Sequence, residues 1–557
     1  MKLRRLLAAP LLAAVVMATG CTNDTDEKEG NTTPLPATDV NARPADQLVS
    51  GGELRLPVAT LGASHNPMSS ESTDDADEFR RAFLPTFFNY DAAGVAQPNT
   101  DFLESASETS SSPTVVSLKF NQRAAWGDGQ PLTAADLIAT WKACNGQSQG
   151  FSCSPDLRFN EISKVEQGSD EGEAIVTFNS AQPQWRHVFD RVSMLRADSV
   201  ANPQVFNDGW DSEIKKEWTA GPFTISSASS KAVVLQPNQS WWGSDPKLGR
   251  LSAVAIPEEN QLQAWRNNEI DVFDVGTSSQ QYAEAKKVTD STIRRSSATD
   301  FRELLFNTQS DSPISEEPVR QAIALSLNRS GIGQTDYPDI DFTPAPLGNR
   351  VLLTDQFGYV DNAAGTELAN DTGRARKVLD EAGWKESDGT RSKDGRELVV
   401  SFSAVQGVAA SENEAVKLTE QLAKVGIKVE TRTIGVNEFD NRSVLSGGDF
   451  DMIAITSSGS TDPYSDLRQR VGSGEEHNYS RLDAPDVDTA LDQLASETDP
   501  NRQADIANQI DRQLWTKGYS VPLFQLPELT ATKTRLANYG SLGLSTVNWT
   551  QVGFVKG

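Results

Sequence analysis

The sequence predicts an α/β fold built from more than one domain, and two observations lead to this prediction. First, the chain has 557 residues. About 500 of them remain after an N-terminal leader and a polar segment are set aside, too many for one hydrophobic core. Second, strand and helix patterns alternate between residues 397 and 458. That order predicts a parallel sheet with right-handed crossovers.

The N-terminus has the layout of a secretory signal, because Lys2, Arg4 and Arg5 precede an apolar run over residues 6–18. The small residues that follow lead directly into Cys21. This arrangement resembles a bacterial lipobox, where a peptidase cleaves before the cysteine and the sulfur then carries a diacylglycerol. We therefore interpret residues 1–20 as a lipoprotein signal peptide and Cys21 as the lipidation site. The alternative is a plain signal peptide with an incidental cysteine.

Residues 21–50 are predicted to form a disordered tether between the lipid and the folded body. The segment 22–50 has six acidic residues, two basic residues and three prolines, with few large apolar side chains. It cannot bury enough apolar surface to offset its ordering entropy. The whole chain has a net charge of −26, which disfavours nucleic acid and anionic headgroups. No later segment approaches the ~20 apolar residues of a membrane helix, so lipid on Cys21 would be the only membrane attachment.

The first half of the body contains recognisable strands and one capped helix. Leu54, Leu56 and Val58 alternate as in an opening strand, and residues 174–179 and 232–238 are also strand-like. A helix is predicted to begin at Thr133, which has Asp136 three positions later as a capping box. Cys144 and Cys153 follow this helix. Because export takes them to an oxidising compartment, a disulfide is the first expectation, whereas their spacing does not suit a metal site.

The second half supplies the alternating elements. Residues 397–405 are a mostly apolar run typical of a buried strand. Apolar residues then recur at helical spacing, at Ala415, Leu418, Leu422 and Val425. The segments IKVETRTI and FDMIAITSS follow as strands. Two helices are predicted before this unit, over 316–329 and 374–384, the latter with Gly383 at its C-cap.

No catalytic motif is recognisable in the chain. GxSxG, HExxH, a phosphate loop and GxGxxG are all missing. The three histidines, His65, His187 and His477, are better explained as surface or core residues than as general bases. Carboxylates are plentiful, but nothing singles out a pair for glycoside hydrolysis. We therefore expect a non-enzyme without cofactor or metal, with a secreted glycosidase or esterase as the enzymatic alternative.

A series of segments follows a characteristic order from Gly51 to the C-terminus. In chain order they are WGDGQPLTAADLIATW, AGPFTI, LQPNQSWWGSDPKLGRL, LQAWRNNEIDVFDVG, LLFNTQSDSPISEEPVRQAIALSLNRSGI, RARKVLDEAGW, GGDFDMIAI, STDPYSDL and YSVPLFQL. Together they resemble the family 5 extracytoplasmic solute-binding proteins, the oligopeptide and dipeptide receptors of ABC importers.

The resemblance implies a periplasmic-binding-protein-like α/β fold of type II, cluster C, with two lobes that close on a ligand. Lobe I would comprise residues 51–82, 186–290 and 512–557, with a subdomain inserted at 83–185, and lobe II would comprise residues 291–511. The chain would cross between the lobes near 291–306 and near 519–525, and these crossings would form a hinge.

The same resemblance offers a test of ligand class. In peptide-binding members an aspartate four positions before the proline of a "DP" pair commonly binds the peptide's α-ammonium group. Here the proline is Pro463, and the position four residues earlier is Gly459, which has no charge. Asp462 is a candidate ligand contact, although it can also be explained as a turn cap.

Other segments point to a branch of the family. Three segments resemble an actinobacterial LpqW-like branch, which is implicated in the assembly of mannosylated phosphatidylinositol lipoglycans. They are TWKACNGQSQGFS, PAPLGNRVLLTDQFGYVDNA and SWWG. A mannolipid would suit a cleft with aromatic faces and uncharged donors, which Ser457, Ser458 and Ser460 could supply with Thr461.

Two further places could contact a ligand. At most one of Trp241 and Trp242 can face the cleft if they lie on a strand, and Trp242 is the candidate, with packing beneath a turn as the structural alternative. The loop after the first strand supplies Asn66, Met68 and Ser69, because residues beyond strand ends face the ligand crevice in such folds.

Our leading hypothesis is a lipid-anchored solute-binding protein on the outer face of the cytoplasmic membrane. It would be a monomer that binds a small organic ligand, by family analogy a peptide, and delivers it to the permease subunits of an ABC importer. The second hypothesis is an LpqW-like envelope lipoprotein that binds a mannolipid or a biosynthetic partner and takes no part in uptake.

Overall fold

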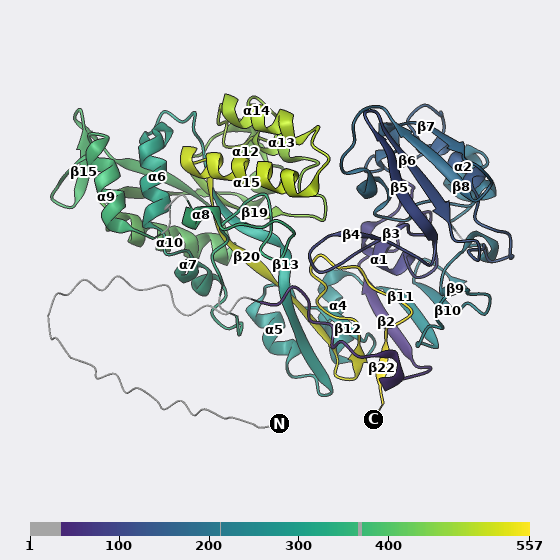
Figure 1. The fold of residues 1–557 in the computed structure, drawn as a ribbon. Helices are drawn as coiled ribbons and strands as arrows, with labels where there is room; N and C mark the ends of the chain where they lie inside the picture. The colour runs from purple at the N-terminus through teal and green to yellow at the C-terminus, as the bar shows by residue number, and fades with distance from the viewer. Residues whose placement is uncertain (1–34, 212, 343, 366–369, 557) are drawn as a thin grey trace, which may run out of the picture.

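The protein has two groups of secondary structure connected by a pair of long strands (Figure 1). The structure is a computed structural model that describes residues 35–556 except 212, 343 and 366–369. Cys21 and the predicted signal peptide therefore lie outside the described residues. The sheet and helices of residues 306–517 gather on one side, and the strands of residues 53–255 gather on the other.

The connecting strands are β13 (Ser291–Phe306), which matches the first predicted crossing, and β20 (Ser520–Lys533), which begins within the second and extends beyond it to Lys533. They pair antiparallel along almost their whole length, from Ser291 opposite Lys533 to Leu305 opposite Ser520. The register shifts between Ser297 and Phe301. Such an irregularity locally interrupts the ladder and allows the strands to bend.

On the lobe II side, β13 continues into a mixed six-stranded sheet with the order β12-β20-β13-β19-β17-β18. β17 (Val399–Val405) pairs parallel with both β18 (Lys428–Ile434) and β19 (Met452–Ser458). Helix α10 (Ala409–Ala423) connects β17 to β18 and packs on both. The predicted βαβαβ unit is thus confirmed, but the sheet also contains antiparallel pairs that the local pattern did not indicate.

Two predicted helices differ slightly from the structure. The single helix expected over 316–329 is two helices, α6 (Glu317–Ser326) and α7 (Arg329–Asp336). The break arises because the side chain of Asn328 accepts a hydrogen bond from the Gly331 N–H and so caps a new helix. The next helix, α9 (Thr372–Glu381), ends near Gly383, whose φ of 89° is the left-handed geometry of a helix stop.

Lobe I is built on a four-stranded sheet with the order β2-β11-β10-β9. The strands are β2 (Glu53–Val58), β9 (Phe223–Ala228), β10 (Ala232–Pro237) and β11 (Arg250–Ala255). In β2 the predicted alternation is confirmed, since Leu54, Leu56 and Val58 are buried and the residues between them are not. This strand pairs parallel with β11, which lies about 200 residues later.

The inserted segment forms a second four-stranded sheet and the capped helix. Its strands are β5 (Leu103–Ser111), β6 (Thr114–Phe120), β7 (Ile162–Gln167) and β8 (Glu173–Phe178), in the order β5-β6-β8-β7. Helix α2 (Ala134–Cys144) begins after Thr133, whose backbone N–H donates to the Asp136 carboxylate at 3.0 Å. One continuous hydrophobic core joins this sheet to that of lobe I, so the segment packs as part of lobe I.

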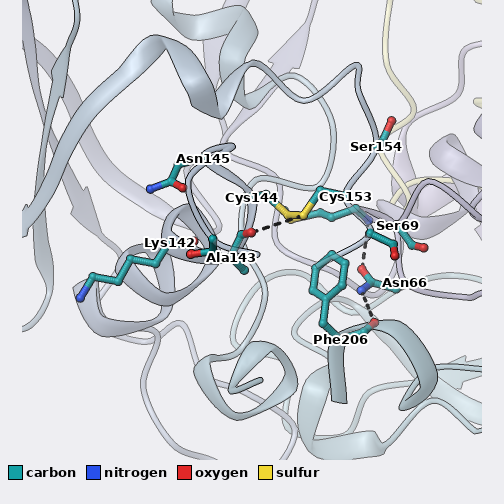
Figure 2. The surroundings of a disulfide bond; sticks show 12 residues. Asn66, Ser69, Lys142, Ala143, Cys144, Asn145, Cys153, Ser154 and Phe206 are labelled. Carbon is teal, nitrogen blue, oxygen red and sulfur yellow. Dashed lines mark hydrogen bonds between the residues drawn. A yellow bond between two sulfur atoms is a disulfide. The ribbon is translucent and has the colours of Figure 1, made fainter. Parts of the chain in front are cut away.

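A disulfide joins Cys144, the last residue of α2, to Cys153, with their Cα atoms 5.7 Å apart (Figure 2). It closes the short loop between them. The backbone of Cys153 in turn forms an isolated bridge with Ser69 from the loop after β2. The disulfide thus lies within the inserted segment, and the backbone bridge from Cys153 to Ser69 connects this segment to the first loop of lobe I.

The predicted tether extends too far into the body. Residues 35–50 belong to lobe I, where Asp39 bridges Ser541 and β1 (Leu48–Val49) pairs with β22 (Gly553–Val555). The side chain of Asn41 also donates to the Leu536 carbonyl at 2.8 Å. The composition of this segment is poor in apolar residues, but its backbone is satisfied by C-terminal residues about 500 positions away, which local composition cannot reveal.

Two expected lobe boundaries also differ. Residues 512–517 belong to α15 (Pro500–Lys517), whose Leu514 and Trp515 are buried in the cores of lobe II, so lobe I resumes only after β20. Residues 264–285, which were expected in lobe I, share a core with the six-stranded sheet. This range contains the end of α4 (Glu258–Arg266), all of β12 (Val272–Asp274) and all of α5 (Ser279–Ala285).

Candidate functional site

A cavity of about 450 Å³ lies between the two lobes. From lobe I it is lined by the turn between β3 (Phe88–Tyr90) and β4 (Ala96–Pro98) and by a segment of the inserted subdomain around Gln184. From lobe II it is lined by the loop that follows β19 and by the start of α15. Its lining residues include Gln184, His187, Gln356, Phe357, Thr461 and Gln503.

Among the described residues, three hydrogen-bonded contacts join the lobes around this cavity. The Arg158 guanidinium of the inserted subdomain donates to the Asp462 carboxylate at 2.7 Å. The side-chain amide of Gln184 donates to Gln503 at 2.9 Å, and the Phe357 N–H donates to the Ala93 carbonyl at 3.2 Å. Because each contact joins residues of different lobes, the structure has the lobes closed against one another.

The lobe I wall of this cavity contains a buried polar cluster. The Tyr90 hydroxyl and His187 Nδ1 are 3.0 Å apart, and the two rings are stacked. Burial lowers the pKa of His187, so the imidazole is neutral at pH 7. Burial also raises the pKa of the neighbouring Asp190 to about 6, although Arg191 and Arg81 oppose this shift. Asp462 acts on both groups through its negative charge.

A second cavity, of about 470 Å³, lies within lobe II and is named here the lobe II cavity. Strands β13 and β19 supply its floor through Glu303, Leu305 and Ser457. Its other lining residues include Arg350, Phe439, Arg442, Leu445, Ile455, Ser458, Asp466, Arg470, Val471, Tyr479 and Tyr519. The carboxyl end of β19 thus lies at one cavity and its following loop at the other, as expected for ligand sites beyond strand ends.

Some of the ligand contacts predicted for the end of β19 and the loop after it line these cavities, and others do not. Ser457 and Ser458 line the lobe II cavity. Gly459 lines neither cavity; its N–H donates to the Thr299 carbonyl, and a Cβ there would collide with Leu353. Ser460 is also structural, since its hydroxyl donates to the Asp462 carbonyl. Asp462 is 6% exposed and binds Arg158 across the lobes, which neither the ligand-contact nor the turn-cap interpretation anticipated.

The prediction for the loop after β2 is wrong, because the loop is buried against its own lobe; Figure 2 shows Asn66 directed toward the Phe206 backbone. Asn66 is 0% exposed; its amide donates to the Phe206 carbonyl at 2.9 Å, and its oxygen accepts from the Met68 N–H at 3.0 Å. Met68 packs in the lobe I core, and Ser69 pairs with Cys153. These residues line neither cavity and instead fix the loop beside the disulfide.

Trp242 is also structural. Its indole N–H donates to the Asp101 carbonyl at 2.6 Å, and its ring contacts both Trp241 and Phe102. It lines neither cavity. The packing alternative considered for this residue is therefore the correct one.

Residues that the sequence reasoning missed make the contacts between the lobes. Arg158 begins a single-turn 3-10 helix and Gln184 lies in a turn of the inserted subdomain, and no periodicity or motif distinguishes them. Glu303 did leave a signal, because FRELLF places a charged pair, Arg302 and Glu303, among the apolar residues at the end of the crossing strand.

The described residues contain no cluster of three or more His, Cys, Asp or Glu side chains that could hold a metal ion. Within the same part of the chain, no helix combines the length and the apolar character needed to cross a bilayer.

Comparison with known proteins gives consistent relatives. The family profile described as "Bacterial extracellular solute-binding proteins, family 5 Middle" matches residues 97–478. The oligopeptide-binding protein OppA of Mycobacterium tuberculosis is 30% identical over 561 aligned positions, which cover 99% of this chain and 93% of OppA. An LpqW-like branch is not among these findings.

Two solved structures share the fold. A periplasmic EDTA-binding protein, EppA, matches with a TM-score of 0.74 and 22% identity over 94% of this chain and 99% of its own. The periplasmic murein tripeptide-binding protein MppA, in an unliganded open form, matches with a TM-score of 0.74 and 16% identity over the same shares. These likenesses confirm the predicted periplasmic-binding-protein-like α/β fold.

The ion pair between Arg158 and Asp462 is expected to favour the closed arrangement. In the variant Arg158→Gln the buried Asp462 carboxylate loses its cationic partner, which should shift the closure equilibrium toward the open form by about 1 to 2 kcal/mol. Small-angle scattering of the unliganded protein should then give a larger radius of gyration. Arg432→Gln is the matched control, because Arg432 pairs with Asp449 entirely within lobe II. An equal change in both variants, or none in either, would contradict this role.

The raised pKa of Asp190 predicts a pH-dependent stability. The folded state binds this proton more tightly than the unfolded state, so the contribution of Asp190 is fully favourable below about pH 4 and is lost as pH rises through about 6. Asp190→Asn, which is permanently neutral, should therefore be more stable than the parent protein at pH 7 to 8, by roughly 1 to 3 kcal/mol. The difference should vanish near pH 4 in urea unfolding. Asp505→Asn, an exposed site on α15, provides the control; a pH-independent difference for Asp190→Asn would refute the assignment.

Proposed function

Because the chain belongs to family 5 of the bacterial extracellular solute-binding proteins, we propose that it captures a peptide outside the cytoplasmic membrane and presents it to the permease subunits of an ABC importer. The observation that carries the proposal is the cavity between the two lobes, which the Arg158–Asp462 and Gln184–Gln503 contacts bridge. A ligand that contacts both lobes would favour closure by its differential affinity for the closed state. The bound molecule is released unchanged, so no catalytic group is required.

A peptide is supported as the ligand by the relatives whose names specify one. OppA is described as oligopeptide-binding and MppA as murein tripeptide-binding, whereas EppA is described as EDTA-binding. The lining of the two cavities combines aromatic or aliphatic faces with several hydrogen-bonding side chains. This mixture suits a ligand with a polar backbone and variable side chains.

The proposed anchor is a diacylglycerol on Cys21. Leu35, the first described residue, lies 14 positions further along the chain, so the intervening segment can reach at most about 50 Å. The body would remain close to the outer face of the cytoplasmic membrane, within reach of a permease. We expect a monomer that needs no second copy, since both walls of the cavity come from one chain.

A second function is favoured by one observation. Peptide-binding members of the family commonly have an aspartate four positions before the proline of the "DP" pair, and here that position is the uncharged Gly459. In that case the protein would be an LpqW-like envelope lipoprotein that binds a mannosylated phosphatidylinositol intermediate and acts in lipoglycan assembly. Deletion of its gene would then alter the lipoglycan profile and leave peptide uptake unchanged.

Thermal unfolding with a peptide library separates these functions. A peptide present at about 100 times its dissociation constant should stabilise the folded protein by about 2.7 kcal/mol, which corresponds to a rise in Tm of roughly 2 to 3 °C for a chain of this size. The library should contain di- to hexapeptides, and free amino acids serve as the reference. No response to any peptide, together with stabilisation by a mannosylated phosphatidylinositol, would replace the transport function by the second one.

A further inference from the structure

We propose that a smaller cavity between the lobes, named here the side chamber, receives one large apolar side chain of the bound peptide and selects it over a charged one. The side chamber has a volume of about 320 Å³. The inference rests on the proposed function and names a property of the peptide that this site selects.

Both lobes build the side chamber. From the inserted subdomain it is lined by Arg158, Glu161 and residues 182–184, and from lobe II by Tyr464 and by parts of α14 (Pro485–Leu494) and α15. Arg158 and Gln184 also make two of the contacts between the lobes. A group that occupies the chamber therefore touches both lobes at once, as a ligand that favours closure must do.

The side chamber adjoins the cavity of about 450 Å³ described above, named here the interlobe cavity. Four residues line both of them, namely Pro183, Gln184, Tyr464 and Gln503. Gln503 is held in place, because its amide donates to the Glu497 carbonyl at 2.7 Å. The Gln184 side chain is bound only by its 2.9 Å hydrogen bond to Gln503 among the described residues. Gln184 can thus turn away and open a passage between the two cavities.

The charged groups of the side chamber are already paired within the protein. The Arg158 guanidinium binds Glu161 at 2.8 Å and Asp462 at 2.7 Å. The other cation of the lining, Arg468, pairs with Asp492 of α14. A charged ligand group placed here would lose its water without gaining an unpaired partner of opposite charge. The chamber therefore disfavours charged side chains and free peptide termini.

The remaining surface suits an apolar group. Leu491 and Leu494 of α14 line the chamber together with Tyr464. Both leucines belong to a hydrophobic core of lobe II, against which Tyr464 packs, so this apolar surface is backed by a packed interior. Burial of further apolar surface against it stabilises the complex. The volume lies at the lower end of the range of about 300 to 1,000 Å³ that ligand pockets have, which suits one large side chain better than a whole peptide.

The interlobe cavity differs in its charge. Glu108 and Arg186 both line it, and the Arg186 guanidinium lies over the Trp185 ring, 4.4 Å from the ring centroid. The polar backbone and the charged groups of a peptide therefore have partners in the interlobe cavity. The side chamber is left for an apolar side chain that branches from the same peptide.

The test uses isothermal titration with tripeptides in which one residue at a time is Ala, Leu, Phe, Asp or Lys and the other two are Ala. At one position of the peptide, Leu or Phe should bind at least about tenfold more tightly than Ala, because more apolar surface leaves water. Asp or Lys at that position should bind at least about tenfold more weakly than Leu, because the chamber has no free partner for a charge.

Ala495→Trp fills part of the side chamber from an exposed position at the end of α14. It should reduce the advantage of Leu or Phe to less than about twofold, while trialanine binds as it does to the parent protein. Ser496→Trp is the matched control and should keep the full advantage, because Ser496 is exposed and lines neither cavity.

Each outcome decides a separate question. Equal binding of all side chains at every position would overturn the selectivity of the side chamber and leave peptide binding intact. An advantage of Leu or Phe that survives in Ala495→Trp would also overturn it, since the side chain would then bind elsewhere. Equal losses for trialanine and the leucine peptide in this variant would overturn it as well, because the substitution would then act on closure.

If no peptide binds, ligand-observed NMR with butanol and benzyl alcohol separates the two proposals. Binding to the parent protein and to Ser496→Trp that Ala495→Trp abolishes would mean that the apolar chamber stands and the peptide function fails. No binding of these alcohols, or binding that Ala495→Trp leaves intact, would refute both.

Discussion

The antiparallel pairing of β13 with β20 is the constraint on which the rest of the structure depends. The chain passes between the lobes along these two strands, and backbone hydrogen bonds tie them together from Ser291 to Leu305. One hydrophobic core runs along this ribbon, since α4 and α5 share it with the lobe II sheet and with Leu529 and Ala531 of β20. Any movement of one lobe relative to the other must therefore twist or bend β13 and β20 as a unit, and the register shift near Ser297 is where the ladder is weakest.

The lobes also meet away from this ribbon. Among the described residues, Leu544 of lobe I packs with Leu347 and Leu353 of lobe II. One ion pair, one amide hydrogen bond and one backbone hydrogen bond connect the lobes around the cavity. Polar contacts of this kind are individually worth about 1 kcal/mol when partly solvated. A closed state held so weakly can respond to a bound molecule, whereas a large apolar interface would lock it shut.

Much of the fold could be predicted from the sequence, because its signals are local. The alternation of Leu54, Leu56 and Val58, the spacing of Ala415, Leu418 and Leu422, and the cap at Gly383 each reflect a period or a conformation that a few residues determine. Residues 35–50 could not be predicted in this way, since their partners lie at the opposite end of the chain. The same limit applies to α15, whose lobe is decided by what it packs against.

The candidate site was harder to predict because its residues become neighbours only in three dimensions. Ser457 and Ser458 were predicted as uncharged donors to a mannolipid, and the structure places them at the end of β19, beside the lobe II cavity. The rule that residues beyond strand ends lie at ligand crevices failed for Asn66 and Ser69, whose loop folds inward against Phe206 and the disulfide. Arg158 and Asp462 are about 300 residues apart, and no feature of either segment indicates that they pair across the lobes.

Distance measurement between spin labels on the two lobes tests the account most directly. Labels at Ser169→Cys in the inserted subdomain and Ser496→Cys in lobe II would lie at exposed positions, in a chain that carries Cys21→Ser. Saturating peptide should replace a broad distribution of distances by a single shorter one. A distribution that stays unchanged while calorimetry shows the peptide bound would contradict ligand-driven closure.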